Sequence, residues 1–77
     1  MAVTVNYLGV IAEATGLSNE KIEMTGSKSG IIKFILEKYP EIKEFSFVVS
    51  HNDSVVHEEV KVQDGDRITL IPPPPGG

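Results

Sequence analysis

The residues best suited to chemistry stand at the end of the sequence, where Gly76 and Gly77 follow a run of four prolines, 72–75. A free carboxylate on Gly77 is a group that can be activated and passed on as an acyl group. Proline fixes φ near polyproline II, and glycine carries no side chain. We therefore expect a stiff, thin tail about 20 Å long that enters a narrow pocket of another protein. The alternative is a loose terminus without a role.

The other polar residues predict no second site. His51 and His57 match no metal-ligand spacing, and two loop histidines are usually solvated. Glu58 and Glu59 adjoin in sequence and point to opposite faces if extended, so paired acid–base work is not expected. With no cysteine, the side chains supply no thiol nucleophile and no disulfide. The sequence predicts no metal site, and a chain that is not an enzyme by itself.

Size and charge narrow the class of protein further. A chain of 77 residues makes one small domain, without room for a deep catalytic cavity. The net charge of −4 argues against nucleic acid as a partner, because phosphate binding needs a basic face. No apolar run has the length of a membrane span, and no basic leader opens the chain. We expect a cytoplasmic protein.

Two strands and one helix are predicted in the first half of the chain. Period-two alternation predicts strands over 2–8 and 21–24, with a loop over 9–19 between them. After a possible cap at Ser27 or Ser29, the spacing changes to three and four. That stripe predicts a helix over about 28–39, ended by Pro40. The stripe comprises Ile31, Ile32, Ile35, Leu36 and Tyr39.

The second half predicts strands alone. We expect a strand over 45–50, a turn at 52–53, a short return strand at 55–56 and a last strand over 67–71 after Asp64-Gly65-Asp66. The order β-β-α-β-(β)-β predicts an α+β fold, with a mixed sheet of four to five strands and one main helix on one face. Residues 1–71 form the domain, and residues 72–77 the extended tail.

This layout resembles the ubiquitin-like β-grasp, and more closely the small, sulfur-carrying subunit of molybdopterin synthase. The resemblance covers nearly the whole chain. Its most specific part is Asp64-Gly65-Asp66, a short apolar strand, Pro72-Pro73 and the final Gly76-Gly77. Asn52 matches an asparagine common at that turn in the family.

The resemblance implies a chemistry for the tail. A ubiquitin-activating-type adenylyltransferase, using ATP and Mg²⁺ that the chain itself does not bind, would adenylate Gly77. A sulfur donor would then displace AMP and leave a thiocarboxylate. Inserted into the large subunit of molybdopterin synthase, the tail would deliver sulfur to cyclic pyranopterin monophosphate to build the dithiolene. The family layout implies a heterotetramer of two large and two small subunits.

Docking requires surface beside the tail. Phe45, Phe47, Ile68 and Leu70 are candidates for an apolar patch on the sheet face that the helix leaves open, although alternation also predicts core positions among them. Arg67 is a candidate ion-pair partner or a solvated surface residue. The predicted partner-binding set is Pro72, Pro73, Pro74, Pro75, Phe47, Arg67, Ile68 and Leu70.

Three other functions stay open. The chain is alternatively a sulfur carrier for thiamin thiazole or cysteine synthesis, although Pro72-Pro73 favours the molybdopterin branch. It is alternatively a ubiquitin-like modifier whose Gly77 is joined to a target lysine. The last alternative is a binding module with a proline-rich ligand tail, which leaves the terminal glycines unexplained.

Overall fold

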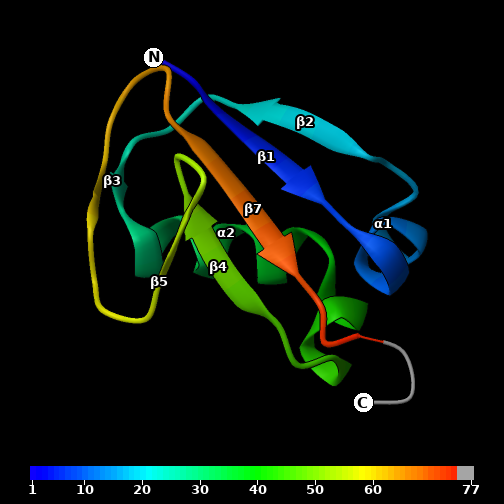
Figure 1. The fold of residues 1–77 in the computed structure, drawn as a ribbon. Coiled ribbons are helices and arrows are strands. Elements are labelled where there is room, and N and C mark those ends of the chain that lie inside the picture. The colour runs from blue at the N-terminus through cyan, green and yellow to red at the C-terminus, as the bar shows by residue number, and fades with distance from the viewer. Residues whose placement is uncertain (75–77) are drawn as a thin grey trace.

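The computed structural model describes residues 1–74, and the predictions for Pro75, Gly76 and Gly77 lie outside this range. One mixed sheet of five strands is covered on one face by a helix, with a two-stranded sheet beside it (Figure 1). The elements in chain order are β1 (Val3–Tyr7), α1 (Gly9–Thr15), β2 (Asn19–Ile22), β3 (Gly26–Ser27), α2 (Lys28–Lys38), η1 (Pro40–Glu44, a 3₁₀ helix), β4 (Val48–His51), β5 (Ser54–Val56), β6 (Lys61–Val62) and β7 (Arg67–Ile71).

The large sheet has the strand order β2-β1-β7-β4-β5, with β1 and β7 parallel at its centre and the other pairs antiparallel. Alternation divides its residues between two faces. On the side of α2, the fully buried residues of the two central strands include Val3, Val5, Ile68 and Leu70. The predicted α+β class, the mixed sheet and the bounds of the last strand are confirmed.

Helix α2 forms where the apolar stripe predicted it. The Ser27 hydroxyl accepts the Gly30 N–H at 3.1 Å and caps the first turn. Ile31 and Ile35 are buried against the sheet. Pro40 stops α2 after Lys38 and opens the 3₁₀ turn η1. Within residues 1–74, no helix has the length and apolar character needed to cross a membrane.

The predicted loop after the first strand is wrong, because residues 9–15 form helix α1. The helix is a single short segment that buries one side chain, Ile11, and ends at Gly16 in the left-handed conformation (φ +77°). One buried residue produces no periodic stripe, so the sequence pattern gave no helical signal. Packing of Ile11 into the core stabilises a segment too short to be a helix alone.

Two predicted strands begin two or three residues away from the observed first residue. The second strand spans residues 19–22, not 21–24, because its antiparallel pairing with β1 runs from Asn19 opposite Asn6 to Ile22 opposite Val3. The third strand begins at Val48, not Phe45. Residues 45–47 carry the chain from η1 to the sheet, and the apolar character of the two phenylalanines was mistaken for strand alternation.

A polar cluster fastens α2 to the edge strand β2. The Glu20 carboxylate accepts the hydroxyls of Tyr7 and Tyr39 at 2.6 and 2.8 Å and the Lys38 ammonium at 2.7 Å. Burial alone opposes ionisation of Glu20, but these hydrogen bonds prevail and lower its pKa. Burial first, and then the bond to Glu20, raise the pKa of Tyr7. The cluster is fully satisfied, and its role is to hold the helix on the sheet.

Candidate functional site

The tail leaves the domain from the middle of the sheet. β7 lies between β1 and β4, and its last pair is Ile71 opposite Val48. Pro72 has no N–H to continue the ladder, so pairing ends where the prolines begin. Because β1 and β7 are parallel, the prolines emerge at the end of the sheet opposite the amino terminus (Figure 1). The central strand thus connects the core directly to the predicted reactive tail.

The first proline of the tail lies against the start of α1. Gly9 has φ +54°, and a Cβ placed on it would stand 3.1 Å from Cγ of Pro72. A side chain at residue 9 would therefore be strained and would press on the proline ring. The sequence alone does not predict this contact. Its only signal is a glycine directly after the first strand, which indicates a turn without indicating what lies beside it.

A shallow apolar hollow of about 310 Å³ lies beside the prolines. Phe47, one of the predicted docking residues, lines this hollow next to the tail. Phe47 is partly buried, and Pro73 and Pro74 are exposed. The lining residues are Ser46, Phe47, Val48, Ile71, Pro72, Pro73 and Pro74.

Two predicted docking residues are corrected by the structure. Ile68 and Leu70 have no exposed surface and belong to the core beneath α2. Strand alternation turns Ile71 to the opposite, open face of the sheet, where Val48 pairs with it. Val48 is exposed and Ile71 half-buried, so these two missed residues supply the apolar surface at the tail. The sequence signal for these residues was the same period-two alternation, but the prediction assigned alternate residues to the wrong faces of the sheet.

Arg67 is not part of the tail region. It opens β7, four residues or about 13 Å along the strand from Ile71. The guanidinium of Arg67 pairs with the carboxylate of Asp53. The backbone N–H of Arg67 donates to Oδ1 of Asn52 at 2.8 Å. The predicted ion pair with an outside partner is therefore replaced by one within the chain.

Further polar contacts surround that end of β7. Asp66 accepts the Gln63 N–H at 2.9 Å and contacts Nε2 of His51 at 2.8 Å. The Gln63 N–H and then His51 lower the pKa of Asp66 to about 2. Asn52 and Asp53 both have positive φ, as a tight turn between β4 and β5 requires. This end of the strand is fixed by hydrogen bonds between turns.

The remaining polar candidates are dispersed. His51 is held by Asp66, while the Glu59 carboxylate accepts the Ser29 N–H at 2.9 Å at the start of α2. Among residues 1–74, no three His, Cys, Asp or Glu side chains are grouped so as to hold a metal ion.

A mixed five-stranded sheet, one main helix across it and a central last strand that runs into a tail define a ubiquitin-like β-grasp protein. The family model described as ThiS family matches residues 5–77. The chain belongs to the ThiS family, and the resemblance to the β-grasp sulfur carriers is confirmed.

Solved structures agree with this assignment. A chain in the complex of subunits 1 and 2 of molybdopterin-converting factor from Helicobacter pylori is 29% identical, with a TM-score of 0.75 and complete coverage of both chains. A Pyrococcus furiosus protein described as molybdopterin converting factor subunit 1 has 21% identity and a TM-score of 0.86, covering 96% of this chain and 99% of its own. The small archaeal modifier protein 1 of Methanosarcina acetivorans has 21% identity and a TM-score of 0.85, with coverages of 99% and 96%. The last two similarities show the fold.

Proposed function

We propose that this protein is the sulfur-carrying small subunit of a molybdopterin synthase, without catalytic groups of its own. The observation that carries the proposal is the match of the ThiS family model through the final Gly-Gly, together with 29% identity to a chain from a complex of molybdopterin-converting factor subunits. The order Pro72-Pro73-x-x-Gly76-Gly77 supports the same branch.

The proposed chemistry takes place at the carboxyl carbon of Gly77. A carboxylate oxygen attacks the α-phosphorus of ATP at a separate activating enzyme, and pyrophosphate leaves. Sulfur at the oxidation level of sulfide, supplied by the donor as hydrosulfide, then attacks the acyl carbon; the bond to AMP breaks, and a thiocarboxylate remains. Transfer of that sulfur to the pterin precursor on the large subunit, with water supplying the oxygen, restores the carboxylate.

The domain's part in this reaction is to aim the tail. Pro72 lies against Gly9, and Pro72–Pro74 continue from a central strand whose register is fixed by two neighbours. A preorganised tail loses less conformational entropy when it enters a pocket. The hollow beside Phe47 and the outward pair Val48 and Ile71 would form the adjoining contact with the large subunit.

A ubiquitin-like modifier is the second candidate, favoured by the similarity to the archaeal modifier protein. In that function the activated Gly77 carbonyl forms an isopeptide bond with a lysine of a target. The two functions share activation and differ in the acceptor. A thiocarboxylate on the protein supports the carrier, and isopeptide-linked conjugates support the modifier.

The test reconstitutes sulfur transfer with the full chain, a cognate activating enzyme, ATP, a sulfur donor and a molybdopterin synthase large subunit. We expect intact-mass analysis to show one oxygen replaced by sulfur, and the pterin product to form. Deletion of Gly77 should abolish both signals, with an unchanged thermal unfolding midpoint, because the deletion changes none of residues 1–74 that form the described fold. Product formation by the deletion variant would overturn the proposal, as would conjugates in place of product.

A further inference from the structure

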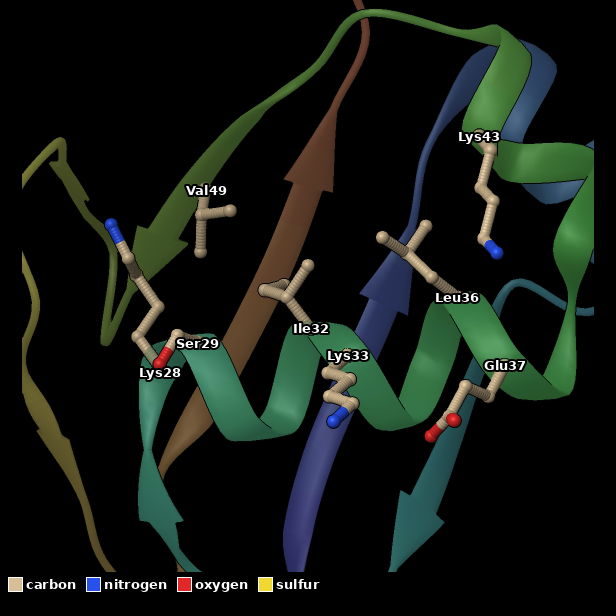
Figure 2. A pocket seen from close by; sticks show the side chains of 8 residues that line it. All are labelled: Lys28, Ser29, Ile32, Lys33, Leu36, Glu37, Lys43 and Val49. Atoms are coloured by element: carbon tan, nitrogen blue, oxygen red, sulfur yellow. The ribbon is translucent and has the colours of Figure 1, made fainter.

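A groove of about 500 Å³ lies on the helix-covered side of the sheet, between α2, η1 and β4. Figure 2 shows Ile32 and Leu36 projecting from α2 toward the space beside Val49, with Lys28 at one end and Lys43 extending from η1 toward the other. Lys33 and Glu37 line its helix side. The site of the proposed function does not use any of these residues.

The groove combines an apolar floor with a positively charged rim. Three of the seven basic residues of a chain with net charge −4 gather there: Lys28, Lys33 and Lys43. Within residues 1–74, none of the three lies within 4.0 Å of a carboxylate oxygen, whereas Lys38 and Arg67 elsewhere are paired. Glu37 is the one acid among the lining residues. The rim therefore carries net positive charge.

Lys28 also interacts with groups that do not line the groove. The Lys28 ammonium donates to the Val56 carbonyl oxygen at 3.3 Å, which holds it at the end of the groove without neutralising it. Glu58 and Glu59 are the second and third residues after Val56. The positive charge of Lys28 is one of the causes that lower the pKa of each carboxyl group. Glu59 is already bonded to Ser29. Neither Glu58 nor Glu59 is among the residues that line the groove.

We propose that this groove binds an acidic peptide segment of a partner protein, one that carries two apolar anchor side chains. Charge complementarity selects the acidic residues, and Ile32 and Leu36 select the anchors. These two floor residues are four apart on α2, so they lie about 6 Å apart along the helix. Anchors at i and i+4 of a helical segment, or at i and i+2 of an extended one, match that distance.

The groove and the tail region lie on opposite faces of the sheet. Val49 lines the groove on the side of α2, and its neighbour Val48 lines the hollow on the other side. Adjacent strand residues point to opposite faces. A partner held in the groove therefore leaves the tail free to enter a second protein, and the domain would connect the two.

The experiment uses ¹⁵N-labelled full-length protein and short synthetic peptides of Asp and Glu that carry two Leu residues at helical or extended spacing. We expect amide shifts at Ile32, Leu36 and Val49. Affinity should fall about tenfold or more in the Lys33→Glu/Lys43→Glu variant, and should also fall with added salt. The matched control is Lys21→Glu/Lys61→Glu, which changes net charge equally at exposed lysines outside the groove.

Each remaining outcome overturns the inference. These outcomes are no shifts with any acidic peptide, equal loss in both double variants, and equal binding when the Leu residues become Ala. Decanoate binding at the same residues while the peptides fail would assign the groove to anionic amphiphiles. Concentration-dependent dimers that Lys33→Glu/Lys43→Glu abolishes, without peptide binding, would assign it to a second copy of the chain. Thermal unfolding of every variant confirms that folding is retained.

Discussion

The two ends of strand β7 have different surroundings. Its first residue lies in a network of polar groups, whereas its last residue lies beside apolar side chains and prolines. Arg67 is held by Asn52 and Asp53, and Asp66 by the Gln63 N–H and His51. At the other end, Ile71 and Pro72 border an apolar hollow and Gly9. One strand therefore links an end whose hydrogen bonds are made within the chain to an end whose apolar surface is partly open.

This difference separates residues that fix the fold from residues available to a partner. Hydrogen bonds between turns are directional, so they set how β4, β5 and β7 meet. Apolar contacts at the tail are non-directional, and open apolar surface can be covered by another protein. Substitutions at the two ends should accordingly differ in what they damage.

The largest effect is expected from the core side of the tail end. Leu70→Ala removes a fully buried side chain and should lower the free energy of unfolding by about 2–5 kcal/mol. Ile71→Ala, half-buried on the other face, should cost only about 1 kcal/mol and should weaken binding of a large subunit instead. Urea unfolding and calorimetric titration measure the two effects. The reverse ranking of stability losses would contradict the assignment of faces.

The next largest loss is expected at the polar end. Asn52→Ala removes the side-chain oxygen that accepts the backbone N–H of Arg67. It also leaves at φ +49° an alanine, which cannot form the side-chain hydrogen bond that asparagine makes there. We expect a loss of about 1–3 kcal/mol in urea unfolding, with sulfur transfer retained below the unfolding midpoint. Asn52→Gly relieves the backbone strain and should lose less. Equal losses in the two variants would show that strain contributes nothing.

At the tail end, Gly9→Ala should have a smaller effect on stability. The left-handed conformation costs about 1–2 kcal/mol for alanine, and the new methyl group presses on Pro72. We expect the rate of sulfur transfer to fall more than stability explains, because the tail is displaced. Gly16→Ala is the matched control, since it has φ +77° but nothing within 4 Å of its Cβ. Indistinguishable transfer rates for the two variants would contradict a positioning role for the Gly9 contact.

The smallest expected effect is a dependence of folding stability on pH, caused by Asp66 at the polar end of β7. The pKa of Asp66 is lowered from 3.8 to about 2, so its ionised form favours the folded state. Its contribution is present above about pH 4 and is lost as the pH falls toward 2. The pKa values of Glu20, Glu58 and Glu59 are also lowered, so the comparison with Asp66→Asn isolates the contribution. If the acid unfolding curves of the unmodified protein and of Asp66→Asn were parallel, they would contradict this contribution of Asp66.

Much of the fold was predictable because its signals are local. The stripe of α2, its Ser27 cap and the strand over 67–71 after Asp64-Gly65-Asp66 all depend on residues near one another in sequence. Helix α1 was not predictable in this way, because its single buried residue packs against elements distant in sequence. The prediction of a strand beginning at Phe45 was wrong for a related reason, because the residue type alone does not distinguish a phenylalanine in a connecting segment from one in a strand.

The sequence by itself determined the β-grasp order of elements, the proline-glycine tail and the absence of cysteine, because each is a matter of residue type and short spacing. Only the tertiary structure decided which face each residue of β7 occupies, that Arg67 pairs with Asp53, and that Pro72 lies against Gly9. It also brought Val49 of β4, residues of α2 and Lys43 of η1 together around the lysine-rimmed groove. These features depend on strand register and on chain segments that meet across the fold, and neither is encoded in neighbouring residues.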